Sequence, residues 1–306
     1  MRCPLDRRRF LARLSRAGLL LTGPWALLLG RPSRAGAAPP LRPVAQAAGS
    51  DPAALVREAL GKLGGMGRFV RPGNRVVVKP NIGWDRTPEE AANTHPEVVA
   101  EVCRLAREAG AARVRVFDRT CNDARRTYER SGIRAALERL ADPAVRLEHV
   151  REDRFEVVPL PGSRVLTRWP LYRPALDAEV RINVPVVKHH GLTGVTLGMK
   201  NLMGLLGGNR GRLHPDIDQS LVDLNAAVRS HLTVVDATRI LLRNGPQGGG
   251  TDHVRPAGKA AASADVVAAD AWGAREFGVD PLSVGHLKAA HDRGLGIADL
   301  ARVPIL

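Results

Sequence analysis

Apolar runs and amphipathic stretches alternate along most of this chain. Short runs rich in Val and Ile predict strands at 74–79, 112–118, 145–150, 155–160, 178–187 and 232–240. Apolar residues at helical spacing predict helices at 52–63, 96–109, 127–140, 193–206, 220–230 and 264–277. Strands that alternate with helices are typical of a mostly parallel sheet with helices on both faces. The pattern therefore predicts an α/β, Rossmann-like fold.

Two stretches interrupt this alternation. Residues 38–51 are rich in Ala and Pro, which predicts a flexible lead-in before a single α/β domain at 52–306. Prolines also accumulate at 150–175. These prolines are equally consistent with a domain boundary and with a smaller sub-domain inserted into one continuous sheet.

Residues 1–37 have the features of an export signal. Residues 7–11, RRRFL, resemble the twin-arginine pattern, and Ala-Gly-Ala at 35–37 is a small-x-small cleavage site. The apolar stretch at 17–30 contains Gly23 and Pro24 and is shorter than the about 20 residues of a membrane span. We therefore predict a folded protein exported to the periplasm or another extracytoplasmic compartment, with no stable membrane span after cleavage. An N-terminal membrane anchor is the alternative.

The basic residues are mostly arginines spread along the chain. The net charge is +15, and residues 1–37 contribute +7 of it (eight Arg, one Asp), which leaves +8 for the rest. Such a scattered excess is typical of a solvated surface rather than a polyanion-binding face. Aromatic residues make up only 4% of the chain, too few for a base-stacking surface, and we expect no nucleic-acid partner.

Lysine is rare in this sequence. Only six of the 46 basic residues are lysines, and three of them, Lys79, Lys188 and Lys200, lie in segments rich in Gly and His. Lysine is a compact charge whose pKa shifts readily on burial, whereas arginine stays charged. The choice of lysine at these positions therefore indicates a local role.

Polar residues and glycines follow each of the main predicted strands. In open α/β sheets, ligands bind beyond the carboxyl ends of the strands. Lys79 and Asn81 follow the first strand, Asp118 ends the second, and Lys188 and His190 follow the strand at 178–187. Alternation along an extended segment places Lys188 and His190 on the same side. We therefore predict a cleft lined by Lys, His and Asn that holds an anionic small molecule.

Two further features extend this predicted site. Thr94 and Glu97 have the spacing of a capping box, which would start the helix at 96–109 and present His95 and free N–H groups to an anion. In a helix at 193–206, Lys200 would return to the face of Thr193. The glycine-rich stretch at 243–250 is equally a flexible linker or a nest of backbone N–H groups for an anion.

The predicted site residues fall into three groups. We expect acid–base or nucleophilic chemistry from Lys188, His190, Lys200 and His95. We expect substrate binding by Lys79, Asn81, Thr94, Thr193, Asn201, Gly248 and Gly249. Asp118 and Asp236 are expected to orient a His or Lys side chain.

The sequence contains no compact metal-ligand motif. His95, His190 and His214 are weak candidate ligands, without HExxH spacing. Cys103 and Cys121 remain after the signal, and their predicted positions, mid-helix and beyond the next strand, are too far apart for a disulfide. Without a ferredoxin-type cysteine run, we expect no iron–sulfur cluster from this chain's own cysteines.

Several of these motifs together resemble the domain of unknown function 362 family. They are VVVKPNIG, THPEVV, the Asp of VRVFDRT, INVPVVKHHGLTGVTLGMKNLMG, His214, LTVVDA, GPQGGG and GLGIADL, between Val76 and Ile297. Lys188 and His190 match the K-x-H of the long segment, and Lys200–Gly204 match its KNLMG. Many members that resemble this chain add ferredoxin-type clusters, which its cysteines do not provide.

Three functions remain open at this point. The first is an enzyme that acts on an anionic small molecule in the predicted cleft. The second is a carrier of a metal ion or redox cofactor loaded before export, which would serve as an accessory to a periplasmic redox partner. The third is a solute-binding protein without catalysis.

Overall fold

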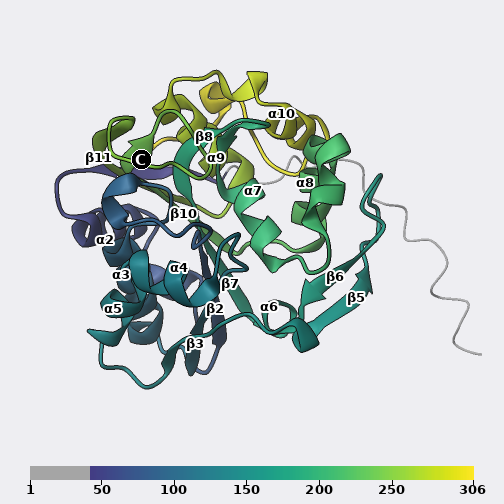
Figure 1. Ribbon diagram of the computed structural model, residues 1–306. Coiled ribbons are helices and arrows are strands. Elements are labelled where there is room, and N and C mark those ends of the chain that lie inside the picture. The colour runs from purple at the N-terminus through teal and green to yellow at the C-terminus, as the bar shows by residue number, and fades with distance from the viewer. Residues whose placement is uncertain (1–41) are drawn as a thin grey trace, which may run out of the picture. The chain divides into compact units, whose positions relative to one another are not determined.

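A nine-stranded sheet runs through the computed structural model, which describes residues 42–306 (Figure 1). In spatial order its strands are β1 (Ala45–Ala48), β11 (Val254–Ser263), β10 (Leu232–Leu241), β7 (Val180–Val184), β2 (Arg75–Pro80), β3 (Arg113–Val116) and β4 (Val145–Leu147). β8 (Val186–His190) pairs with β10 and with β9 (Gly194–Thr196). Pairing is parallel from β10 through β7, β2 and β3 to β4, and antiparallel at β1, β11 and β9. The predicted mostly parallel α/β fold is confirmed.

Helices cover both faces of this sheet (Figure 1). One layer contains α2 (Pro52–Lys62), α3 (Pro96–Glu108), α4 (Ala124–Arg130) and α5 (Ile133–Glu138). The other contains α6 (Arg173–Leu176), α7 (Gly198–Asn201), α8 (Ile217–Ala227), α9 (Val266–Phe277) and α10 (Gly285–Asp292). Short 3₁₀ turns lie at Met66–Arg68, Pro88–Glu90, Glu152–Arg154, Leu202–Leu205, Arg210–Asp216, Pro281–Ser283 and Leu300–Arg302.

Strand β2 shows why the sheet needs both layers. Val76 and Val78 pack into the core beneath α2 and α3, whereas Val77 packs into the core beneath α8 and α9. Side chains alternate between the faces of a strand, so a continuous Val run is apolar on both sides. Each fully buried valine contributes roughly 1.5–3 kcal/mol relative to an exposed one. The Val-rich run is therefore stable only between two helical layers.

The proline-rich segment forms a small insertion. β5 (Phe155–Pro159) and β6 (Arg168–Tyr172) make a separate two-stranded antiparallel sheet between β4 and β7 in the sequence. The Tyr172 ring meets the ring of Phe117 edge-on, with centroids 4.8 Å apart. Of the two alternatives left open by the prolines, the structure shows the insertion into one continuous sheet.

One prediction for the N-terminal part of the chain lies outside the described residues, and another needs correction. Residues 1–37, the predicted signal, lie outside the described residues. The prediction of a flexible lead-in is wrong for Ala45–Ala48, which pair with Lys259–Ala262 as β1. Small alanine side chains allow this edge strand to lie against the core, and Gln46 Oε1 accepts a hydrogen bond from Trp272 Nε1 at 2.9 Å.

The predicted helix at 193–206 is also wrong over its first part. Gly194 adopts φ of +72°, and the chain turns back as β9 before the short helix α7 begins at Gly198. Glycine reaches this left-handed conformation without steric cost, which permits the tight β8–β9 hairpin. Strand β11 was not predicted, because its Ala-rich sequence contains Val254 as its one β-branched residue.

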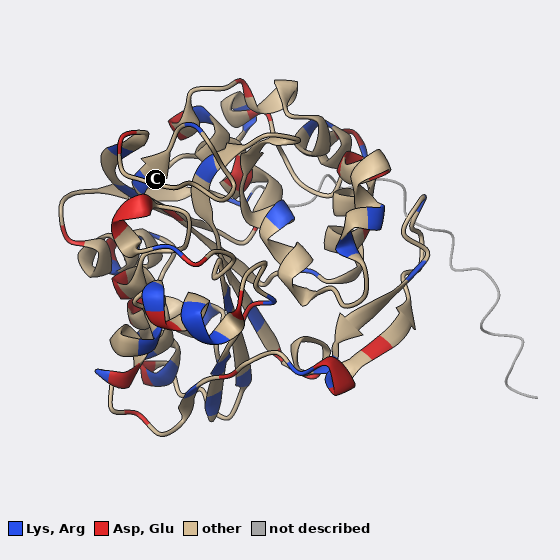
Figure 2. Cartoon of the chain, in the orientation of Figure 1, with Lys and Arg blue, Asp and Glu red and all other residues tan. Residues whose placement is uncertain are grey.

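The surface of the described residues carries charges of both signs. Figure 2 shows Lys and Arg interspersed with Asp and Glu along the outer helices. On α3, for example, Arg104 contacts both Glu101 and Glu108. No helix within 42–306 combines the length and apolar character needed to cross a membrane.

Candidate functional site

A cavity of about 500 Å³ lies beyond the carboxyl ends of β2, β3 and β8. On one side of β2 lies β3, which follows it in the sequence, and on the other side lies β7, which comes later. The connections of the sheet therefore run to opposite sides of β2, which makes this a switch point. Such a switch point is the usual ligand site of an open α/β sheet. The predicted site residues that line the cavity are Lys79, Asn81, Asp118, Lys188, His190, Lys200, Asn201 and His214.

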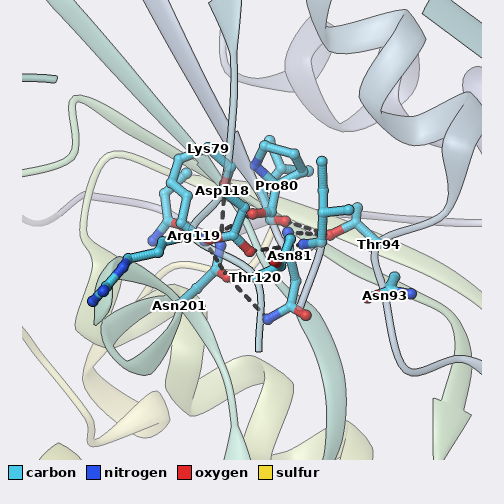
Figure 3. Close-up of polar contacts among 12 residues, drawn as sticks. Lys79, Pro80, Asn81, Asn93, Thr94, Asp118, Arg119, Thr120 and Asn201 are labelled. Atoms are coloured by element: carbon cyan, nitrogen blue, oxygen red, sulfur yellow. Dashed lines mark hydrogen bonds and ion pairs between the residues drawn. The ribbon is translucent and has the colours of Figure 1, made fainter. Parts of the chain in front are cut away.

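We call the side of the cavity formed by β2 and β3 the paired wall, and Lys79 is its centre. Lys79 Nζ lies 2.9 Å from Asp118 Oδ1 and donates to Asn201 Oδ1 and Pro80 O, both at 2.8 Å. Figure 3 shows these groups converging. Burial lowers the pKa of Lys79, and the Asp118 charge opposes that shift. All three ammonium hydrogens have oxygen partners, so the role of Lys79 is structural.

The remaining polar groups of the paired wall are also satisfied. Asp118 Oδ2 accepts from Ile82 N at 2.8 Å, and Asn81 Nδ2 donates to Asn201 Oδ1 at 3.0 Å. Asn201 Nδ2 donates to Lys79 O at 3.1 Å. A Cβ atom at Gly204 would lie 1.8 Å from Asp118 Oδ1, so this network requires glycine there. It joins β2, β3 and α7 into one rigid unit.

The opposite side, formed by β8, β9 and the Lys200 side chain of α7, we call the unpaired wall. Lys188 lies on β8, and its Nζ donates to Ala92 O at 2.5 Å and to Asn81 Oδ1 and Pro246 O, both at 3.2 Å. None of these partners carries a charge. Burial is the main reason that the pKa of Lys188 falls to about 7.

Lys200 has still fewer partners. Within residues 42–306, the hydrogen-bond partner of its Nζ is the Met203 Sδ atom, at 3.6 Å. Burial lowers the pKa of Lys200 to about 8. On β9, Thr196 lies opposite Lys188 in register, is 4% exposed, and its Oγ1 has no hydrogen-bond partner among the described residues. A buried hydroxyl left unbonded is costly, and within residues 42–306 neither Thr196 Oγ1 nor Lys200 Nζ has an oxygen or nitrogen partner.

His190 stands beside these groups as a neutral ring. Its Nδ1 accepts hydrogen bonds from Leu192 N at 3.1 Å and Thr193 N at 3.2 Å, so the ring hydrogen lies on Nε2. Burial, followed by the charges of Lys200 and Lys188, lowers the pKa of His190 to about 3. The structure confirms that Lys188 and His190 face the same cavity, as alternation along β8 predicts.

Asp270, which sequence reasoning did not assign to the site, holds α7 in place. It lies fully buried inside α9, and its two oxygens accept from Gly198 N at 2.6 Å and Met199 N at 2.7 Å. Burial raises the pKa of Asp270 to about 7. A lone carboxylate on the apolar face of an Ala-rich helix was the signal that could have identified it. Other lining or supporting residues missed by the sequence are Thr196, Arg210, Asn183 and Asn225.

Several predicted residues lie away from the cavity: His95, Thr94, Thr193, Asp236, Gly248 and Gly249. Thr94 is not the helix cap. Its Oγ1 accepts from Asn81 N at 2.8 Å and donates to Val184 O at 2.7 Å, which ties two strand ends together. His95 caps α3 instead, because its Nδ1 accepts from Glu97 N at 3.1 Å.

The other predicted residues that lie away from the cavity form hydrogen bonds within the protein. Asp236 accepts from His95 N at 2.7 Å and from Thr238 Oγ1 at 2.6 Å. Thr193 Oγ1 donates to Val195 O, because the β8–β9 hairpin replaces the predicted helix that would have aligned Thr193 with Lys200. Gly248 N donates to Asn244 O at 2.9 Å, and the glycine-rich loop reaches the cavity through Pro246.

Metal ligands are not clustered in the described part of the chain. No group of three or more His, Cys, Asp or Glu side chains within 42–306 could hold a metal ion. His190 and His214 line the cavity, whereas His95 does not. Cys103 is buried, Cys121 is exposed at the cavity, and both are free thiols.

Comparison with known proteins identifies the family. The sequence matches the family described as Domain of unknown function (DUF362) over residues 76–275. This chain belongs to the DUF362 family. The resemblance inferred from the motifs is thus confirmed, and the match covers every cavity-lining residue discussed above.

Among known relatives, this DUF362 chain is 33% identical to the thylakoid-associated protein sll1697 of Synechocystis sp. over 250 residues, which cover 79% of this chain and 75% of the relative. Two solved structures are similar at 12% identity. One is a protein from Thermotoga maritima with a TM-score of 0.43, and the other is the lactate racemase apoprotein from Thermoanaerobacterium thermosaccharolyticum with a TM-score of 0.42. The matches cover 80% and 82% of this chain, but only 60% and 55% of those chains.

Proposed function

We propose that this DUF362 protein is an enzyme that acts on a small anionic molecule in the cavity, after export through a twin-arginine signal. The unpaired wall is the observation that carries the proposal. Lys188, Lys200, His190 and His214 line the cavity together. Among the described lining residues, Asp118 is the one carboxylate, and it is already paired with Lys79.

Electrostatics favours an anionic ligand. Like charges that share a low-dielectric site oppose one another, and the lowered pKa of His190 reflects burial first and then the charges of Lys200 and Lys188. A carboxylate or phosphate placed between these groups would neutralise them. The cavity volume of about 500 Å³ is in the range of small-molecule sites.

Acid–base capacity favours an enzyme over a solute-binding protein. A proton-transfer group works best when its pKa lies near the working pH. Burial brings Lys200 to about 8 and Lys188 to about 7, so both amines exchange protons near neutrality. A binding protein needs only charge, which arginine would supply without such a shift.

The test begins with the protein that is expressed with its own leader and purified after export. Native mass spectrometry and elemental analysis would first identify any bound species, and the protein would then be incubated with small carboxylated and phosphorylated metabolites. We expect consumption of an anionic compound and none of its uncharged amide analogue. In Lys200→Met, turnover should fall by about 10²-fold or more, as expected for loss of an acid–base group.

Lys288→Met provides the matched control, because Lys288 is exposed and pairs with Asp292. Lys200 is a cleaner probe than Lys188, whose removal would leave Ala92 O and Pro246 O without their donor. Unchanged turnover in Lys200→Met would overturn the proposal. A ligand recovered unchanged would support the solute-binding alternative, and a bound metal or cofactor would support the carrier for a periplasmic redox partner.

A further inference from the structure

Lys200 lines the cavity with an amine that has no oxygen partner within the described residues. The chain uses arginine for 40 of its 46 basic residues, since six are lysines. A charge clamp for an anion would be served better by arginine, whose planar fork binds carboxylates with two hydrogen bonds. Arginine cannot act as a nucleophile at neutral pH, whereas an unprotonated lysine can.

The three cavity lysines differ in how far their amines are already engaged. Lys79 Nζ has three oxygen partners including a carboxylate, and Lys188 Nζ has three neutral oxygen partners. Lys200 Nζ has Met203 Sδ as its hydrogen-bond partner within the described residues. A thioether sulfur is a weak acceptor, so the Lys200 amine is the least restrained of the three.

Polar groups that could hold a carboxylate line the same cavity as this amine. Thr196 Oγ1 is buried and unpartnered, and it lines the same cavity. His190 carries its hydrogen on Nε2 because Nδ1 accepts two backbone N–H groups. Together with the Lys188 amine, these donors would bind an anionic group in the cavity that the Lys200 amine also lines.

We infer that Lys200 forms an imine with the carbonyl carbon of a small oxo acid, whose carboxylate is bound by the unpaired wall. This inference rests on the proposed function and names its substrate class. The neutral amine of Lys200 attacks the carbonyl carbon, so an N–C bond forms, the C=O π bond breaks, and one amine proton moves to the oxygen. The carbinolamine then breaks its C–O bond and loses the hydroxyl with the remaining amine proton as water, which gives the imine. The step needs no oxidant or reductant.

Reductive trapping tests the inference on the full-length protein. The protein is incubated near pH 8 with pyruvate, 2-oxoglutarate, acetoacetate or levulinate, reduced with sodium cyanoborohydride, digested and mapped by mass spectrometry. A trapped imine adds the mass of the oxo acid less one oxygen atom. At pH 8 a lysine with a pKa of about 8 has about 100-fold more free amine than a lysine at the usual value near 10.4, so Lys200 should be labelled ahead of a lysine with an ordinary pKa.

In pyruvate, acetoacetate and levulinate the ketone lies progressively farther from the carboxylate. The probe that labels Lys200 best therefore reports the distance between the amine and the carboxylate-binding groups. A hydroxy acid of the same length has the carboxylate but no carbonyl, so it should protect Lys200 without forming an adduct. Lys200→Arg keeps the charge and should give no adduct above the background of exposed lysines. An adduct on Lys188 in place of Lys200, adducts shared evenly among Lys62, Lys288 and Lys200, or no adduct with any probe would overturn the imine on Lys200.

Calorimetry without the reductant separates this inference from the proposed function. If the oxo acids or hydroxy acids bind but no adduct forms on Lys200, the imine is wrong and the anion site stands. If none of the oxo acids, hydroxy acids and phosphorylated compounds binds, the proposed function is overturned as well.

Discussion

The two walls of the cavity each contain a lysine, but the hydrogen-bond partners of the two amines differ. On the paired wall, Lys79 is buried beside Asp118 and has all its hydrogens bonded to oxygen. On the unpaired wall, Lys200 is partly buried, and its hydrogen-bond partner within 42–306 is a sulfur atom. The partners of the amine nitrogen therefore distinguish the structural lysine from the reactive one.

The difference has an energetic consequence. A buried ion pair gains little net stability, but removal of one partner leaves a buried charge without compensation. Lys79 and Asp118 are in this position. Lys200 has no such dependent partner, so its removal should change the chemistry of the cavity far more than the stability of the fold.

Lys79→Met should have the largest effect on stability. It leaves Asp118 buried and unpaired, and we expect a loss of about 3–5 kcal/mol in the free energy of unfolding. Lys200→Met should stay within about 1 kcal/mol of the wild type, as substitutions without buried dependent partners usually do. Urea unfolding of both variants measures the contrast, and equal losses would remove the distinction between the walls.

Gly204→Ala should disturb the paired wall without removing a charge. The added Cβ would meet Asp118 Oδ1 at 1.8 Å and Lys79 Cε at 2.5 Å, so the pair must move apart. We expect a loss of roughly 1–3 kcal/mol, the usual cost of overpacking. Gly67→Ala is the control, because a Cβ there meets nothing within 4 Å. A neutral Gly204→Ala would show that the pair is not tightly held.

Asp270→Asn should loosen the unpaired wall by weakening the anchor of α7. Loss of one of the two acceptors for Gly198 N and Met199 N should cost about 1–3 kcal/mol. The pKa of Asp270 is near 3.9 when unfolded and about 7 when folded, so the folded protein holds its proton more tightly. The contribution of Asp270 to stability is therefore full below about pH 4 and is lost as pH rises through 7.

The stability difference between wild type and Asp270→Asn should accordingly narrow as pH rises from 4 to 7. Thermal unfolding across this range measures it. A pH-independent difference would contradict the assignment of a raised pKa to Asp270. If Asp270 positions Lys200, the variant should also shift the pH profile of turnover, which a purely structural loss elsewhere would not do.

Thr196→Val should have the smallest effect on the fold. The Thr196 hydroxyl has no partner among the described residues, so its replacement by a methyl group of similar shape should be neutral or stabilising by up to about 1 kcal/mol. Anion affinity should instead fall by about 1 kcal/mol, or roughly fivefold, through the lost hydrogen bond. A clear loss of stability with unchanged anion affinity would place the hydroxyl outside the binding site.

The sequence predicted the fold and the paired wall better than the unpaired wall. Val-rich strands that end in Lys79, Asp118 and Lys188 are visible as local patterns, and strand ends meet at one edge of a parallel sheet. Thr196 was missed because a glycine-dependent hairpin replaced an expected helix. Asp270 is distant in sequence from α7, and only the packing of α9 against α7 makes its carboxylate a cap for that helix.

The most direct test of the unpaired wall is the titration of the six lysines by nuclear magnetic resonance, with isotope-labelled lysine Cε atoms. We expect the Lys200 signal to titrate near pH 8, and a bound carboxylate or phosphate should raise that pKa because an anion favours the charged amine. Lys288 provides the reference for an exposed lysine. If Lys200 titrates near the usual lysine value of about 10.4, and no small anion moves its pKa, the cavity has no reactive unpaired amine and the proposal is wrong.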